Sequence, residues 1–177
     1  MPTLVKINRA PVLTLWATIV AERLGFDPEA ALTIGRAVAG LTAQTKGQRL
    51  GIYHPREKED GAEGHEPAAD GQLVFVTLMG RAIPSLLTRG TLRAAEKGKP
   101  SDPDSVRRYL SSKFGEDLAE VEAALRELAS AFPADRLEES AYALYERFRP
   151  EVPKGAKGWG AMGELNLDRV RSLKPGT

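Results

Sequence analysis

The residue types that most often carry chemistry are sparse in this chain of 177 residues. It has no cysteine, which excludes thiolate nucleophiles, disulfides and cysteine-based metal sites. The only histidines, His54 and His65, flank an acidic segment, and histidine together with carboxylates can bind a divalent metal. That segment lacks the regular three- or four-residue ligand spacing of a preorganised site. We therefore expect no metal site.

A glycine pattern near the C-terminus matches a dinucleotide-binding motif in its letters. Gly158, Gly160 and Gly163 have the spacing of the fingerprint, which needs a buried strand before it, a βαβ unit after it and an acid about 20 residues further on. Here a loop rich in Pro, Gly and Lys precedes the glycines, and only fourteen residues follow Gly163. We interpret the match as coincidence and expect no cofactor.

Other catalytic patterns are also missing. The sequence has no nucleophile elbow, no zinc-protease helix motif and no phosphate-binding loop. Carboxylate pairs such as Glu116 with Glu120 and Glu138 with Glu139 lie beside apolar helical stripes, where solvated faces are expected. We therefore predict a protein that is not an enzyme and has no catalytic residues.

The distribution of charge is more informative than the net charge of +1. Two segments, 30–56 and 71–95, contain no acid but seven basic residues in all, and an acidic segment separates them. Basic residues on accessible elements can contact the phosphates of double-stranded DNA. Arginines on a surface are more often simply solvated. The predicted nucleic-acid contacts are Lys46, Arg49, Arg81, Arg89 and Arg93.

Two strongly apolar helices are predicted near the N-terminus. The first begins near Pro11 and ends at Gly25, and the second begins with Asp27 as N-cap and Pro28 at the first helical position. Both are apolar over most of their circumference, so each must be buried by the rest of the chain or by a second subunit.

Small residues in the second helix allow another helix to approach closely. These are Gly35, Ala39 and Gly40. Such residues normally indicate tight packing within one core, and an intersubunit contact is the alternative. Because a lone helical pair could not cover its own apolar surface, we expect a homo-oligomer, with a homodimer as the working hypothesis.

A β-hairpin is predicted in the middle of the chain. Residues 72–79 are rich in strand formers, Gly80 and Arg81 suit a tight turn, and residues 82–88 can return. Pro84 cannot donate to a ladder, so the returning strand is expected at an edge. The preceding segment, 54–70, has six acids, two bases and no apolar periodicity, and is expected to be a mobile loop.

From Ser101 the pattern is helical again. Three amphipathic helices are separated at Gly115 and Pro133, the last stops at Pro150, and a short tail helix is expected around 168–173. The predicted fold class is α+β, mainly helical: an N-terminal helix pair, one β-hairpin, and a C-terminal three-helix bundle with a short tail helix. We expect a single domain over residues 1–177. No apolar run approaches the ~20 residues of a membrane span, which favours a cytoplasmic protein with no membrane partner.

Two functions fit these features. The first is a DNA-binding or regulatory module that acts as a homodimer through phosphate contacts. The order helix, helix, hairpin resembles a winged helix-turn-helix, although such a module has three helices before its wing. The alternative is a non-catalytic protein-interaction or scaffold protein whose N-terminal helices form the partner surface. Charge geometry separates them, since a DNA binder needs its basic residues on one face and a scaffold can scatter them.

Overall fold

The computed structural model describes residues 4–49, 72–88, 91–96, 99–151 and 162–173, with only the backbone at 43–49, 96 and 162. These residues form a mixed α+β fold in which helix predominates, which confirms the predicted class. In chain order the elements are β1 (Leu4–Asn8), α1 (Arg9–Arg23), α2 (Pro28–Arg49), β2 (Gln72–Leu78), β3 (Arg81–Thr88), β4 (Thr91–Glu96), β5 (Lys99–Pro100), α3 (Pro103–Phe114), the 3₁₀ turn η1 (Gly115–Asp117), α4 (Leu118–Ser130), α5 (Ala134–Phe148), β6 (Met162–Asn166) and α6 (Leu167–Ser172).

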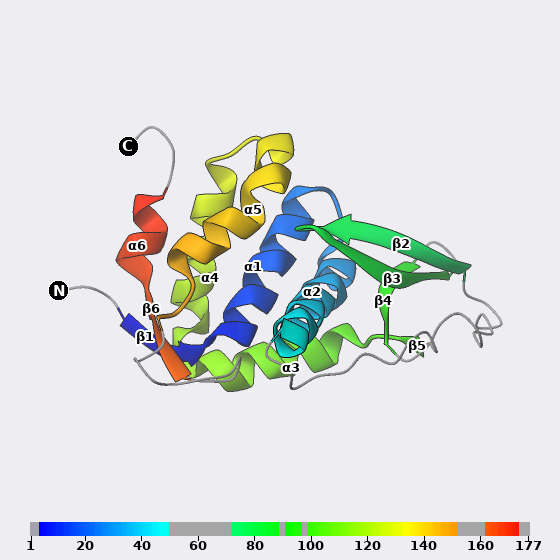
Figure 1. Cartoon of the computed structure of the whole chain (residues 1–177), viewed down its shortest axis with the longest axis horizontal. Coiled ribbons are helices and arrows are strands. Elements are labelled where there is room, and N and C mark those ends of the chain that lie inside the picture. Colours follow the sequence, from blue (N-terminus) through cyan, green and yellow to red (C-terminus); the bar gives the residue numbers. More distant parts are fainter. Residues whose placement is uncertain (1–3, 50–71, 89–90, 97–98, 152–161, 174–177) are drawn as a thin grey trace.

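Helix α1 lies at the centre of the molecule (Figure 1). It has α4 and α5 on one side, α2 and the larger sheet on the other, and α3 beneath. All its residues from Pro11 to Ala21 are buried. A helix that is apolar all round must be covered all round, and the chain itself supplies this cover. The apolar residues that motivated a dimer through α1 and α2, such as Ile19 and Ile34, are therefore buried inside one chain.

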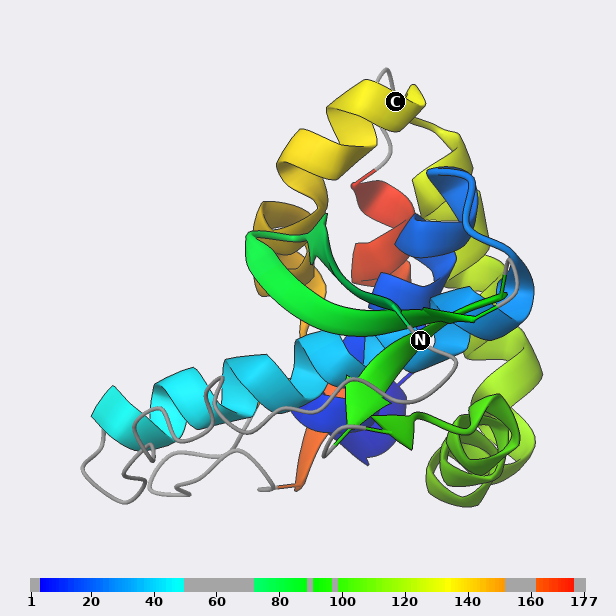
Figure 2. The same cartoon turned by 90° about the vertical axis from the view of Figure 1, so that its right-hand side faces the viewer.

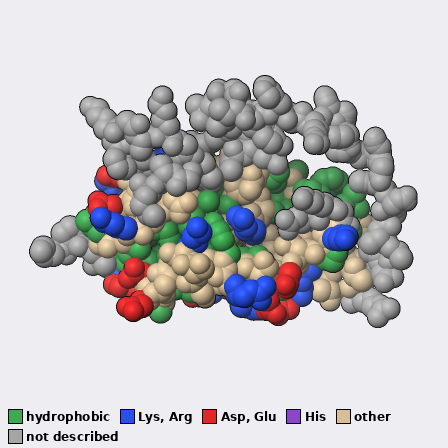
Figure 3. All heavy atoms as spheres, turned by 90° about the horizontal axis from the view of Figure 1, so that it is seen from below, with side chains coloured by type: hydrophobic (Ala, Val, Ile, Leu, Met, Phe, Trp, Pro, Cys, Tyr) green, Lys and Arg blue, Asp and Glu red, His purple; other side chains and the backbone are tan. Residues whose placement is uncertain are grey.

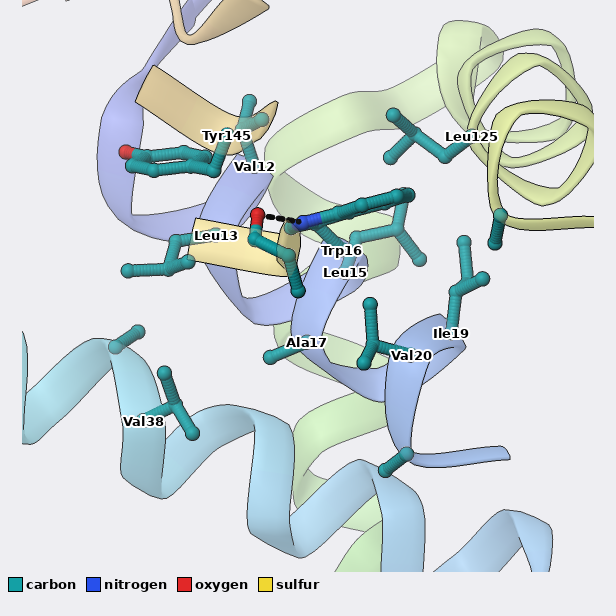
Figure 4. Packing of buried hydrophobic residues seen from close by; sticks show 14 of the residues in the cluster. Val12, Leu13, Leu15, Trp16, Ala17, Ile19, Val20, Val38, Leu125 and Tyr145 are labelled. Atoms are coloured by element: carbon teal, nitrogen blue, oxygen red, sulfur yellow. Dashed lines mark hydrogen bonds between the residues drawn. The ribbon is translucent and has the colours of Figure 1, made fainter. Parts of the chain in front are cut away.

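Trp16 joins α1 to α5 at the middle of the core (Figure 4). Its indole Nε1–H donates to the carbonyl oxygen of Ala141 over 2.9 Å. Its ring meets Phe148 edge-to-face, with 5.3 Å between the centroids. A fully buried indole needs a partner for its N–H, and a carbonyl of the neighbouring helix provides it. This contact sets how α5 packs against α1.

The second helix begins as predicted and packs closely on the first. The Asp27 carboxylate accepts from the backbone N–H groups of Glu29 and Ala30, at 3.0 and 3.1 Å. At Gly35 a Cβ would lie 2.6 Å from the Thr14 carbonyl oxygen, so only glycine allows this approach. Gly40, by contrast, is exposed and has open space where a Cβ would lie. The close approach is thus a contact within the chain, made at Gly35.

The predicted hairpin is present, but it is part of a larger sheet. Strand β2 pairs with β3, and β3 also pairs with β4 in the antiparallel order β2–β3–β4–β5. The predicted hairpin is therefore only half of a four-stranded sheet. The expectation that the strand with Pro84 lies at an edge was wrong, because β3 has neighbours on both sides.

Hydrogen bonding of β4 explains why Pro84 is tolerated in this strand. Ala94 donates its N–H to Thr33 and accepts from Ser101, so its backbone groups point away from β3. Its partner Ser85, the first residue of β3 that pairs with β4, therefore directs its backbone groups toward β2. Pro84 precedes Ser85, and its backbone faces the β4 side at a position where β4 no longer pairs with β3. Its missing N–H leaves no ladder bond unmade.

The tip of the hairpin is docked into the core. Met79 and Gly80 both have positive φ angles, 51° and 79°, as a two-residue hairpin turn with the twist of its strands requires. Leu78 is completely buried and Met79 is 7% exposed. A wing that reaches into DNA must project from its domain, and this tip does not.

The two ends of the described chain are paired in a second, two-stranded sheet. β1 runs antiparallel to β6, with Ile7 opposite Gly163. A Cβ at Gly163 would lie 2.7 Å from the carbonyl oxygen of Glu151, so this glycine permits close backbone packing. Gly163 lies in a strand, whereas a dinucleotide fingerprint requires its glycines at the start of a helix. The sequence did not predict this sheet.

The later helices surround α1. Asp102 caps α3 by accepting from the N–H of Asp104 over 3.0 Å, and Gly115 ends α3 with a φ of 56°, both at the predicted positions. α3, α4 and α5 each contact α1, so they complete the core around it. The expected mobile loop at 54–70 lies outside the described residues. Among the described helices, none is long and apolar enough to cross a membrane.

The helix contact at Gly35 leads to a matched prediction. Gly35→Ala places a methyl group against the backbone of α1, which should lower the free energy of unfolding by about 1–3 kcal/mol. Gly40→Ala has open space and gains helix propensity, so it should be neutral or stabilising by up to about 1 kcal/mol. Urea unfolding of both variants checks this. Equal effects at the two positions would contradict the described packing.

Candidate interaction surface

Strand β2 has apolar side chains on both of its faces. On the inner face Leu78 is fully buried and Val76 packs against the core. On the outer face Leu73 is 48% exposed and Phe75 is 65% exposed. A strand that is apolar on both faces is typical of sheets covered on both sides. The described chain covers only the inner side of β2.

We call the exposed side the β2 outer surface, made of Leu73, Phe75 and Thr77 with Ala82 of β3. All four residues are exposed, and Ala82 lies directly opposite Thr77. Phe75 is the most exposed large apolar residue among the described ones. Single exposed apolar residues are common on proteins, but neighbouring ones on a strand mark a place where another surface can bind.

The same strand presents an open edge. Within the described residues β2 is the outermost strand of its sheet, as Figure 1 shows. Phe75 lies opposite Pro84, which faces away from β2 as described above, so this is a non-hydrogen-bonded pair. The backbone N–H and C=O of Phe75 therefore point to the open edge, as do those of Leu73 and Thr77. No charged residue lies in β2 to discourage pairing there.

The five predicted phosphate contacts are not gathered into one described cluster. Arg93 donates to Glu29 over 2.9 Å and to the Leu92 carbonyl, and only 17% of its side chain is exposed. Arg81 follows the buried hairpin tip and is half-buried. Lys46 and Arg49 lie on the last turns of α2, and their side chains are outside the description. Arg89 is outside the described residues.

The described part of the face that carries α3 has charges of both signs. In Figure 3 the Lys and Arg side chains of this face are separated from one another, with Asp and Glu beside several of them. Arg107, for example, pairs with both Glu29 and Asp104. On the described part of this face the basic residues are not gathered into one patch.

Burial shifts the ionisation of two side chains that join α5 to α1. It raises the pKa of the Tyr145 hydroxyl well above its usual value and lowers the pKa of Arg9. The Arg9 Nε–H donates to the Pro150 carbonyl over 2.9 Å, and the Tyr145 hydroxyl lies 3.5 Å from the Arg9 carbonyl. These contacts fasten the end of α5 to the start of α1.

No metal-binding group was found in the part of the chain that the structure describes. There, no three His, Cys, Asp or Glu side chains lie close enough together to hold an ion. His54 and His65 are outside the described residues. The β2 outer surface was missed at the sequence level, although its signal was the unbroken apolar run of residues 73–76.

The ion pair of Arg93 can be tested as a structural contact. Arg93→Gln and Glu29→Gln should each lower the free energy of unfolding by about 0.5–1 kcal/mol, because the pair joins β4 to α2. The double variant should lose little more than either single one. Urea unfolding measures all three, with Arg108→Gln on the exposed face of α3 as the control. Strictly additive losses would contradict the coupling.

Comparisons with known proteins add no relative: no family model, no curated protein and no solved structure matches this chain.

Proposed function

We propose that this protein is a non-catalytic interaction protein that assembles as a homodimer by pairing β2 with β2 of a second copy. The observation that carries the proposal is the uncovered apolar face and open edge of one strand. The apolar residues of α1 and α2 from which the sequence indicated assembly, such as Ile19 and Ile34, are buried inside one chain. We therefore propose the sheet, and not the N-terminal helices, as the binding surface for a partner.

The strand is self-complementary when two copies run antiparallel. Phe75 is the central residue of β2, so a two-fold axis beside it places Phe75 opposite its own copy. Leu73 then lies opposite Thr77 of the second copy, and Val74 opposite Val76. Because the backbone groups of Leu73, Phe75 and Thr77 point to the open edge, these residues form hydrogen-bonded pairs in this register. No backbone group at the centre of the interface is left without a partner.

Charge and burial favour a second copy as the occupant. The edge is uncharged, so two copies meet without repulsion between like charges. The two Phe75 rings come together on one face of the joined sheet, where each covers apolar surface of the other. An unrelated partner would need a strand of similar character, whereas a second copy brings one by symmetry. The joined sheet would have four strands from each copy.

This assembly requires no catalytic residue. The outer faces of the two sheets would form one continuous apolar strip, flanked by the helical bodies. Such a strip gives a scaffold with two equivalent bodies at a fixed distance, consistent with a regulatory or structural role.

The homodimer is tested by its mass. Light scattering at micromolar concentration should give twice the mass of one chain, and Phe75→Lys should give the mass of one chain because it places two like charges at the axis. The variant should remain folded, since Phe75 is exposed in a single copy, and its melting temperature should fall only by the stabilisation that dimerisation supplies. Leu4→Lys is the control: Leu4 is also a large exposed apolar residue, 48% against 65% for Phe75, but it lies in β1. A single-chain mass for the unmodified protein, or a dimer that survives Phe75→Lys, would rule out this interface.

Duplex DNA is the second candidate, and one observation favours it. α2 continues to Arg49, and Figure 2 shows its C-terminal end extending away from the rest of the molecule. Lys46 and Arg49 are three residues apart on this end, a spacing that puts neighbours on one helix face. No acid follows Glu29 in the helix. Such a helix end can approach phosphates without the hairpin.

The DNA proposal has a separate test. Fluorescence anisotropy with a labelled duplex should show binding at ~50 mM salt that weakens by at least tenfold at ~200 mM, because phosphate contacts release counterions. The variant with Lys46→Gln and Arg49→Gln should lose this binding. A control variant with Arg108→Gln and Lys113→Gln removes the same charge from α3 and should keep it. No binding at the lower salt, or equal loss in both variants, would refute specific use of α2.

A further inference from the structure

A cavity of about 290 Å³ lies where α2 meets the sheet and the start of α3. Its walls are mostly small or apolar side chains, and none of them belongs to β2. The lining residues are Thr33, Arg36, Ala37, Gly40, Leu41, Pro84, Ala94, Ala95 and Ser101. Its volume is near the lower end of the range for sites that bind small molecules.

Hydrogen bonds hold the walls of this cavity in place. The Thr33 hydroxyl donates to the Ala30 carbonyl over 2.8 Å and accepts from the Ala94 N–H over 3.0 Å, which fixes β4 on α2. The Ser101 N–H donates to the Ala94 carbonyl over 2.8 Å, which fixes the approach to α3. The three segments that form the cavity are thus joined to one another, and the space between them is built into the fold.

Arg36 provides a cation at this cavity. Its guanidinium carbon lies 4.3 Å from the centre of the Tyr109 ring, so a cation–π contact orients it. Among the described residues no carboxylate pairs with Arg36, whereas Glu29 on the same helix pairs with both Arg93 and Arg107. An oriented guanidinium without a carboxylate partner can bind an anion through two parallel N–H bonds.

A second groove of similar volume differs in this respect. It lies between α1, α2, α3 and α4, and its two cations are Arg126, which is 2.7 Å from Glu22 and 2.8 Å from Glu122, and Arg107, which pairs with Glu29 and Asp104. Both charges are therefore already compensated. An anion would therefore find an uncompensated cation at the Arg36 cavity and not in this groove.

We infer that the cavity at Arg36 binds a small organic monocarboxylate, with the carboxylate on the guanidinium and a short apolar chain against Ala37, Ala94 and Ala95. One cation matches one negative charge, and the small apolar walls match a hydrocarbon chain of a few carbons. The inference does not depend on the homodimer, because none of these residues belongs to β2.

Hexanoate is the probe, and its uncharged analogue hexanamide is the matched control ligand. In protein NMR, millimolar hexanoate should shift the backbone amides of Gly40, Ala94 and Ser101 in a saturable way, and hexanamide should bind at least tenfold more weakly. Arg36→Gln should weaken hexanoate binding at least tenfold, and Arg108→Gln should leave it unchanged. Both arginines are exposed, so the folded spectrum serves as the check on structure.

Filling the cavity gives an independent variant. Gly40→Leu adds a side chain in open space at the cavity wall and should block hexanoate while the protein stays folded. Saturable shifts lost in both Arg36→Gln and Gly40→Leu would support the site. Absence of shifts at millimolar hexanoate, equal binding of hexanamide, or unchanged binding in either variant would overturn it.

Discussion

Because α1 is apolar on every side, the other elements are placed by the need to cover it. Every residue from Pro11 to Ala21 is buried, and the cover comes from five different elements, namely α2, α3, α4, α5 and β1. Burial of this kind is worth about 25 cal/mol per Å² of apolar surface, and among the described residues α1 has the longest unbroken run of buried positions. The polar groups on α1 are satisfied locally, since the Thr14 and Thr18 hydroxyls donate to carbonyls one turn back. The helices bury their apolar faces against α1, whereas the outer face of β2 remains exposed.

What could be predicted from the sequence was mainly local. The two Asp-Pro helix starts, the glycine that ends α3 and the hairpin turn depend on residues within a few positions of one another. The β1–β6 sheet could not be found this way, because each five-residue strand is stable only beside a partner at the other end of the chain. The position of Pro84 was misjudged for a related reason: its tolerance depends on where β4 stops pairing.

The candidate surface, too, depends on residues that are distant in the sequence. The apolar run in β2 was read correctly as a strand, but its meaning depends on which of its faces the rest of the fold covers. Arg93 was read as a free basic residue because its partner Glu29 is 64 positions away along the chain. Arg36, in the same acid-free segment as Lys46 and Arg49, has an aromatic ring for a neighbour and no described carboxylate. Composition identifies the acid-free segments, but only the fold shows which of their basic residues have an acidic partner.

The pairing of β1 with β6 has a consequence for the order in which the molecule is made. During synthesis Leu4 to Asn8 leave the ribosome long before their partners, Met162 to Asn166, are translated. Closing a loop of this length is entropically costly and is deferred until most other contacts exist. Until then α1 lacks the cover that α4 and α5 supply, and its apolar surface stays open to water. While the residues between α1 and α5 are translated, the nascent chain therefore has a strongly apolar helix without its full cover, and such exposed surface makes folding intermediates prone to aggregate.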